Sequence, residues 1–261
     1  MTGRANPRQL QGDNMGVLES RLFGPKPRGS HGLVVELLGS AIVTGEIPEG
    51  SILPGDPELM ERFGVSRTVL REVMKTLAAK HLIEAKSRVG TRVLARERWN
   101  FIDADVIGWR LRAGIDLEFA AHLADMRLAL EPAAAALAAR HASSDELIAL
   151  YAIAARMEDP AHTRESIAQV DLEFHVAIAR MSRNPFMRSV TSLIEAALAV
   201  IFHLSSPATS SEGLRTLASN HLHIVHAIAA RDAPRAEEAM RHVIGMGMDG
   251  VERTVKTGLS R

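Results

Sequence analysis

The chain has 261 residues, of which 46% are hydrophobic, and its 31 basic and 31 acidic side chains balance. This length allows two modest domains, each with its own core, and the lack of cysteine excludes a disulfide framework, a thiolate metal site and a catalytic thiol. Because no run approaches the roughly 20 apolar residues of a membrane span and the start lacks the apolar core of a signal peptide, we expect a cytoplasmic protein without a membrane partner.

The first elements follow a tail, residues 1–29, which is rich in Gly, Pro and Arg and is expected to be mobile. Apolar spacing then predicts a helix over 33–43. A short helix follows, capped by Asp56 and ended by Gly64, and then a longer helix capped by Ser66. Two short extended segments, "LIEAK" and "TRVLA", come next and predict a hairpin.

Helix, helix, tight turn, helix and hairpin within 30–98 is the order of a winged helix-turn-helix. Between Arg62 and Arg98, ten basic side chains face three acidic ones, a local net charge of +7 that favours an anionic partner. A solvated face of Lys and Arg would give the same charge.

In a winged fold the start of the third helix enters the major groove of double-stranded DNA, while the wing contacts the backbone or the minor groove. The residues predicted to contact DNA are Ser66, Arg67, Thr68 and Arg71 in the helix and Arg88, Gly90 and Arg92 in the wing. The residues left for the core side of that helix are Val65, Val69, Val73 and Leu77.

From Leu117 the pattern is helical to the end. Both tryptophans lie in 99–116, which we expect to be a linker. Helices are predicted over 117–141, 144–158, 163–182, 185–204, 213–231 and 233–255. The second domain, 117–255, is therefore expected to be an all-α helical bundle followed by a tail at 256–261, and the fold class is mainly α.

A carboxylate and several histidines lie on these helices. Asp171 and His175 are one turn apart on the apolar stripe of 163–182, where an isolated charge would cost several kcal/mol. On 213–231, His221 falls among apolar residues, whereas His223 and His226 face outward. A structural Asp–His pair would explain the first two residues alone. Together with His221, they form a candidate site for a divalent metal (Zn, Ni or Mn) with an open coordination position.

Arg127 lies on the apolar face of 117–141. A buried guanidinium requires an anion, because it cannot lose its proton. Glu131, four residues on, is one candidate partner. The carboxylate of a bound ligand, held by two parallel hydrogen bonds, is the other.

The segment "GSILPGDPELMERFGVSRTVLREVMKTLAAKHLIEAKSRVGTRV" resembles the DNA-binding domain of the GntR superfamily of bacterial transcription factors, with a likeness that spans 33–93. One departure is Pro57, where family members often carry an Arg that contacts DNA. The segments "ADMRLALEPAAAALAARHA", "VDLEFHVAIARMSRNPFM" and "NHLHIVHAIAARDAPRAEEAMRH" are similar to the FCD effector domain of the FadR-type members, over about 117–248. The segment "RERWNFIDADVIGWRL" is similar to the linker of FadR-type regulators of sugar-acid catabolism, D-galactonate repressors among them.

This resemblance implies that Asp171, His175 and His221 bind a divalent metal and that Arg127 holds the carboxylate of an organic or sugar acid. The fourth ligand of the family is a His. Its place is taken here by Val243, and the neighbouring His242 is rotated by about 100° around the helix. The sequence leaves open three protein ligands, a helix shifted to admit His242, or no metal, and we favour three ligands.

These features predict a metabolite-responsive transcriptional regulator, a repressor that binds a palindromic operator as a homodimer, because one winged domain reads only a half-site. A small carboxylate or sugar acid in the metal-containing pocket would release or alter its binding to DNA. One alternative is a metalloregulator that senses the metal itself. The other is a metal-dependent hydrolase or lyase fused to a DNA-binding module, but we find no credible general base or nucleophile besides the ligands and expect no enzyme.

Overall fold

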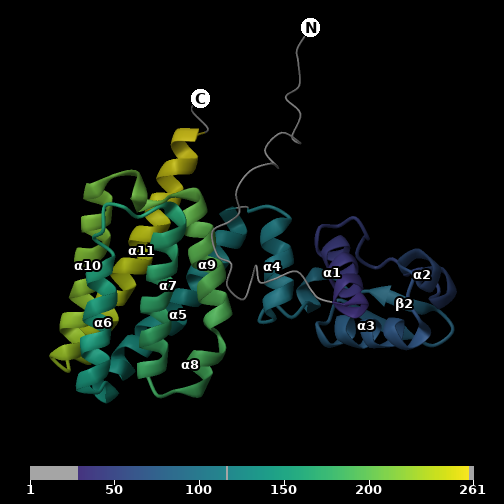
Figure 1. Cartoon of the computed structure of the whole chain (residues 1–261), viewed down its shortest axis with the longest axis horizontal. Helices are drawn as coiled ribbons and strands as arrows, with labels where there is room; N and C mark the ends of the chain where they lie inside the picture. The colour runs from purple at the N-terminus through teal and green to yellow at the C-terminus, as the bar shows by residue number, and fades with distance from the viewer. Residues whose placement is uncertain (1–28, 116, 259–261) are drawn as a thin grey trace, which may run out of the picture.

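Figure 1 shows the computed structural model of the chain, which describes residues 29–115 and 117–258. A winged domain that contains α1 to α3 lies at one end, a bundle of helices α5 to α11 lies at the other, and α4 lies between them (Figure 1). The expected tail at 1–29 lies outside the described residues, except for Gly29 at the start of α1.

The winged domain has the predicted order of elements. They are α1 (Ser30–Val43), α2 (Asp56–Phe63), α3 (Arg67–Ala79), β1 (Ile83–Lys86) and β2 (Gly90–Val93). Helix α2 ends at Gly64, whose φ of 62° lies in the left-handed region that glycine adopts without strain. The side chain of Ser66 caps α3 by accepting a hydrogen bond of 3.4 Å from the amide of Val69. The prediction for Asp56 was wrong: Gly55 is the N-cap, and Asp56 lies in the first turn, where its charge favours the helix dipole.

The core of this domain forms mainly between α1 and α3. Leu70, Val73 and Leu77 are fully buried on α3. Val65 and Val69, which were predicted for the core side, are only partly buried. Both still pack against the core, next to the predicted Val73 and Leu77. The prediction missed Leu70, which follows the i, i+3, i+7 spacing of one helix face with 73 and 77.

The wing is an antiparallel hairpin in which Ile83 pairs with Val93 and Glu84 with Arg92. An isolated bridge from Ile52 to Arg92 ties the hairpin to the loop before α2. Arg88 lies exposed in the turn with a φ of 63°, a conformation that is uncommon outside glycine.

The segment that we expected to be a linker contains a helix, α4 (Ala104–Arg112), after a short 3-10 turn, η2 (Arg96–Arg98). One side of α4 buries Val106 and Trp109 in the core of the winged domain, together with Trp99. The other side buries Ile107 and Leu111 against α5 and α9. The helix therefore belongs to both cores, because its apolar residues occupy two faces.

The bundle contains the predicted helices with one break. Its elements are α5 (Leu117–His141), α6 (Ser144–Arg156), α7 (Arg164–Met181), α8 (Pro185–Ser189), α9 (Thr191–Leu204), η3 (Pro207–Thr209), α10 (Ser211–Ala229) and α11 (Ala233–Gly258). The single helix predicted over 185–204 is divided at Val190, which leaves the helical region with φ −98° and ψ 12°. Helix α11 continues to Gly258, into the segment that we expected to be a tail.

By length and composition alone, one stretch, Thr191–Thr209, is apolar enough to cross a membrane, so the expectation that no such run exists was wrong. Most of this stretch is α9, in which every residue from Leu193 to Phe202 is buried. Its apolar character is that of a central helix, covered by α4, α5, α7 and α11.

Candidate effector site and DNA-reading surface

The three predicted metal ligands come together in the middle of the bundle. Asp171 and His175 project from α7, and His221 projects from α10. All three are buried, with at most 3% of their surface exposed. One possible ligand atom from each lies within 4.8 Å of the others, so they form a potential metal site.

The hydrogen bonds of His221 determine which of its nitrogens faces Asp171. Its Nδ1 lies 2.8 Å from the carbonyl oxygen of Leu217, one turn back on α10, and only a protonated Nδ1 can donate there. In the neutral ring Nε2 then carries a lone pair, and this atom lies 2.8 Å from Asp171 Oδ1. Neither atom has a hydrogen-bond partner of acceptable geometry. Two buried electron-rich atoms at this separation favour a cation between them.

His175 lies between two acidic groups and a guanidinium. Its Nδ1 is 2.5 Å from Glu131 Oε2, and its Nε2 is 3.7 Å from Asp171 Oδ2. The terminal nitrogen of Arg127 lies 3.2 Å from the same Nε2. Arg127 also donates from Nε to Glu131 Oε1, at 2.5 Å. Glu131 is therefore the partner of Arg127. Its carboxylate also lies against Nδ1 of His175, although this nitrogen, too, has no hydrogen bond of acceptable geometry.

Both carboxylates stay ionised despite their burial. Desolvation raises the pKa of Glu131, but the Arg127 guanidinium and the His175 ring outweigh it and lower the pKa to about 2. Desolvation likewise raises the pKa of Asp171, and the nearby His221 and His175 rings reverse this effect, so that the pKa falls below its usual value. Metal ligation would require both rings to be neutral, and Glu131, Asp171 and Arg127 would then together carry one excess negative charge.

These residues fit a divalent cation by their chemistry. One carboxylate and two imidazoles are ligands that Zn and similar metals accept, and three protein ligands leave a position open. The unpartnered Asp171 Oδ1 and His221 Nε2 favour a cation at this place. Phe174 packs edge-on against the rings of His221 and His175, at 4.8 and 5.8 Å between centroids, and helps to fix their orientation.

A cavity of about 430 Å³ opens beside the three ligands and is also lined by Arg127. Val243 lines this cavity from α11, whereas His242 is exposed and does not line it. The shift of α11 that would admit His242 is therefore not seen. The apolar wall consists of Leu198, Ile201 and Phe202 of α9. The polar wall includes Ser205, Ser206, Ser210, Thr216 and Asn220.

The sequence did not assign a role to Glu131 beyond that of partner to Arg127, and it missed the polar wall entirely. The signal for Glu131 was present, because it lies one turn from Arg127 on the same face of α5. Serines in a loop carry no such signal, since periodicity does not predict where a loop lies.

Most of the predicted DNA contacts are exposed. Ser66, Arg67, Thr68 and Arg71 are exposed at the start of α3, and Arg88 and Gly90 are exposed in the wing. Among the described residues, Arg67, Arg71 and Arg88 make no ion pair, which leaves their guanidinium groups available to phosphates or bases. Arg92 differs, because it is half-buried opposite Glu84 in the hairpin.

Comparison with known proteins gives matches over both domains. Residues 32–93 match the family of "Bacterial regulatory proteins, gntR family", and residues 122–245 match the "FCD domain". The chain is 35% identical to the uncharacterized HTH-type transcriptional regulator YieP of Escherichia coli (strain K12), over 81% of this chain and 91% of that protein. It is 32% identical to the galactonate operon transcriptional repressor of the same strain, over 79% of this chain and 90% of that protein. Among solved structures, a similar fold is found in Lar, which controls the expression of the Listeria monocytogenes agr system. The TM-score is 0.57 at 20% sequence identity, and the match covers 88% of this chain and 99% of that one.

Proposed function

The chain belongs to the GntR family of bacterial regulatory proteins and carries an FCD domain, and from this premise we propose that it is a transcriptional repressor controlled by a small acid. The family consists of DNA-binding regulators rather than enzymes. The observation that carries the proposal is the buried group of Arg127, Asp171, His175 and His221 beside a cavity. A regulator of this kind acts in the cytoplasm, on double-stranded DNA.

The charges of this group support a metal and a carboxylate bound together. With a divalent cation held by Asp171, His175 and His221, the excess negative charge becomes one excess positive charge. A single carboxylate in the cavity would neutralise it. Arg127 supports the same ligand, because its guanidinium would leave His175 Nε2 when that atom takes up the metal and could then donate to the acid. Zn, Ni and Mn all suit these ligands. The bound metal would supply a positive charge that oxygens of the acid could coordinate.

The polar wall of the cavity favours a hydroxylated acid over an apolar one. Thr216 and Asn220 from α10 and the serines at 205, 206 and 210 offer hydroxyl and amide groups at the side of the cavity. This arrangement suits a sugar acid, and the name of one relative, the galactonate operon transcriptional repressor, makes D-galactonate the first acid to test.

Helix α9 offers a route from the cavity to the DNA. Leu198, Ile201 and Phe202 of α9 line the cavity, while Ala196, Ala197 and Val200 lie in the cluster formed with α4. Since α4 is also part of the winged core, a shift of α9 on ligand binding would displace the winged domain. To act as a strong switch, the acid must favour one arrangement by a few kcal/mol.

Operator binding requires two copies in our proposal. One winged domain reads a half-site, and a homodimer matches a palindromic operator. Arg67 and Arg71 on α3 would enter the major groove, and Arg88 would contact the backbone next to it.

The test measures metal, acid and DNA separately. The chain is stripped with EDTA and titrated with Zn²⁺, Ni²⁺ and Mn²⁺ by calorimetry, and then with D-galactonate, lactate and dicarboxylates. An operator is selected from a random DNA library, and its affinity is measured with and without each ligand. We expect one metal per chain, acid binding only in the metal-loaded protein, and weaker DNA binding with the acid.

The matched variants lie on one helix. His221→Ala should abolish metal and acid binding, whereas His223→Ala, exposed on the same α10, should change neither. If the metal alone releases the operator and no acid binds, the protein is a metalloregulator. If His221→Ala retains metal and acid binding, the proposed site is wrong.

A further inference from the structure

The effector cavity, which is the hollow of about 430 Å³ beside the three metal ligands, extends away from them along three helices. Its lining residues occur from 221 back to 213 on α10, from 243 to 250 on α11 and from 198 to 205 on α9. At about 1.5 Å per residue, these stretches are roughly 12, 10 and 10 Å long. The cavity therefore has a far end that lies roughly 10 Å from the metal ligands.

Two contacts show that these stretches lie side by side. Asn220, the residue before His221, places its Nδ2 3.0 Å from the Sδ of Met246 on α11. At the far end, a Cβ added to Gly250 of α11 would lie 2.8 Å from Ser205 Oγ, at the end of α9. Helix α11 thus meets α10 near the metal ligands and meets the end of α9 at the far end, so both ends belong to one cavity.

The far end is formed by residues 205–210, which connect α9 to α10 as a strap. A Cβ added to Gly213 of α10 would lie 2.6 Å from the carbonyl oxygen of Pro207, and Ser205 is similarly close to Gly250 of α11. Because packed atoms do not approach this closely, the strap can occupy its place only while both helices carry glycine there. The strap is therefore held tightly between α10 and α11.

Hydroxyl groups gather at this far end. The Oγ atoms of Ser206 and Ser210 accept hydrogen bonds from backbone amides at 3.3 and 3.0 Å, which leaves their protons available for donation. The hydroxyls of Ser205 and Thr216 make no hydrogen bond within the described part of the chain. The strap and α10 thus offer several hydrogen-bonding groups to a hydroxylated ligand.

The charges at the far end favour a neutral group. Glu212 and Arg253 also line the cavity there, and their opposite charges cancel. A second carboxylate would find no net attraction at this place, whereas a hydroxyl can both donate and accept hydrogen bonds. The far end therefore suits the terminal hydroxyl of an aldonate better than the second carboxylate of a diacid.

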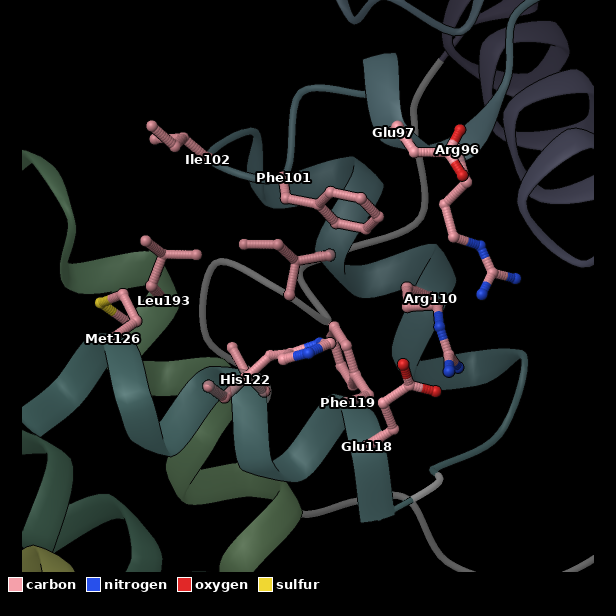
Figure 2. Close-up of a pocket in the computed structure, with 12 residues that line it drawn as sticks. Arg96, Glu97, Phe101, Ile102, Arg110, Glu118, Phe119, His122, Met126 and Leu193 are labelled. Atoms are coloured by element: carbon pink, nitrogen blue, oxygen red, sulfur yellow. The ribbon is translucent and has the colours of Figure 1, made fainter.

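A second hollow, of about 530 Å³ at the junction between the two domains, lacks these groups (Figure 2). Figure 2 shows Phe101 and Phe119 facing it from opposite sides, with Met126 and Leu193 at one end. Among the described residues that line it, none carries a hydroxyl or an amide side chain. Apart from charged groups and His122, a sugar chain would meet apolar surface there, so the effector cavity is the better site for it.

We propose that the strap selects the effector by its length, and that Ser205 hydrogen-bonds the terminal hydroxyl of a six-carbon aldonate. The inference rests on the proposed function and adds the chain length of the acid and the residue that reads its end. An extended six-carbon acid, with carbon–carbon bonds of about 1.5 Å and an oxygen at each end, spans roughly 9 Å. When its carboxylate lies at Arg127 and the metal ligands, its last hydroxyl reaches the strap. A three-carbon acid ends well before it.

Calorimetry on the full-length chain, with and without Zn²⁺, tests the selection by length. The probes are aldonates of three, four, five and six carbons, each as several stereoisomers, with D-galactonate and D-gluconate among the longest. We expect the affinity to rise at least a hundredfold from three carbons to six. Galactarate, in which a carboxylate replaces the terminal hydroxyl of D-galactonate, should bind at least tenfold more weakly than D-galactonate.

Three variants test the residue that reads the end of the acid. Ser205→Ala should weaken binding of the best six-carbon aldonate at least tenfold, because its terminal hydroxyl is left unpaired. Binding of the three-carbon acid and of Zn²⁺ should stay within about twofold, since neither touches the strap. Gly250→Ala, which displaces Ser205 without removing its hydroxyl, should have the same selective effect. The matched control is Ser211→Ala, an exposed serine next to the strap that does not line the cavity, and it should change nothing.

The outcomes separate this inference from the proposed function. Equal affinity for three-carbon and six-carbon aldonates, or an equal loss for both in Ser205→Ala, would refute the selection by length and leave the acid-binding site intact. Galactarate that binds as tightly as D-galactonate would refute the hydroxyl contact at the strap. If no acid of any length binds, with or without Zn²⁺, the proposed function fails together with the inference.

Discussion

The indole nitrogen of Trp109 donates a hydrogen bond of 2.8 Å to Glu36 Oε2, which joins α4 to α1 across 73 residues of sequence. The other oxygen of Glu36 accepts from Arg112 at 2.6 Å. The Trp109 ring lies against Gly39, where a side chain would not fit. Helix α4 is therefore attached to the winged domain by packing, a hydrogen bond and an ion pair.

Gly39→Ala tests this attachment. The added Cβ would lie 2.3 Å from the Trp109 ring, so the ring or α1 must move. We expect a loss of about 1–3 kcal/mol in unfolding free energy, as for other overpacked cores, and a shift in tryptophan emission. Gly245→Ala on α11, with no atom near its Cβ, is the control and should be neutral or stabilising by up to about 1 kcal/mol. Equal effects at both glycines would contradict the close contact.

Lys80 should make the winged domain sensitive to alkaline pH. Burial lowers the pKa of Lys80, but its hydrogen bonds with Asp103 and Asp105 outweigh burial and raise the pKa above the usual 10.5. A raised folded-state pKa gives a stabilisation that is complete below the unfolded pKa of about 10.4 and lost as the pH rises through the folded pKa. Urea unfolding between pH 8 and 12 should show a loss of stability above pH 10 that is absent in Lys80→Met. Lys75→Met, at an exposed lysine, should keep that loss.

Glu131→Gln should weaken metal binding without removing a ligand. The carboxylate lies against His175 Nδ1 and orients the ring, and loss of such a partner typically costs 10- to 100-fold in metal affinity. Competition with a chelator for Zn²⁺ measures the change. The control is Glu173→Gln, an exposed residue on α7 that pairs with Arg156 outside the site. An unchanged Zn²⁺ affinity in Glu131→Gln would mean that His175 needs no such orientation.

Val243→His should add a fourth ligand. Val243 lines the effector cavity from α11, whereas His242 points to solvent. We expect the Zn²⁺ affinity to rise at least tenfold, which corresponds to about 1.4 kcal/mol, and His242→Ala to have no effect. A loss of Zn²⁺ affinity in His242→Ala would instead support a shift of α11 that makes His242 a metal ligand.

Arg67→Ala and Arg88→Ala should weaken DNA binding in different ways. Arg67, at the start of α3, is placed for base contacts, so its loss should cost about 1–3 kcal/mol on the selected operator and relax its specificity. Arg88 lies in the wing, so its loss should weaken binding to all DNA sequences. It should also reduce the slope of log affinity against log salt concentration by about one. Gel-shift titrations at several salt concentrations measure both. Arg140→Ala, at an exposed arginine of the bundle, should change neither.

Much of the fold could be predicted from helical periodicity and from a few residues that begin or end helices. Gly64 and Ser66 set the turn before α3, and the apolar stripes of α7 and α10 predicted which faces are buried. The errors lie where periodicity gives little information. The break at Val190 carries no proline or glycine, and α4 has apolar residues on two faces, which resembles no single stripe.

The sequence by itself determined that Asp171, His175 and His221 lie on inward faces, because a 3.6-residue repeat places each side chain relative to its own helix. Only the tertiary structure decided which helices are neighbours, and hence that Glu131 bridges Arg127 and His175, that Val243 lines the cavity, and that Trp109 fastens α4 to α1. Periodicity is a local property of the chain. Neighbours across helices depend on how all the apolar faces can be covered at once, which no single segment encodes.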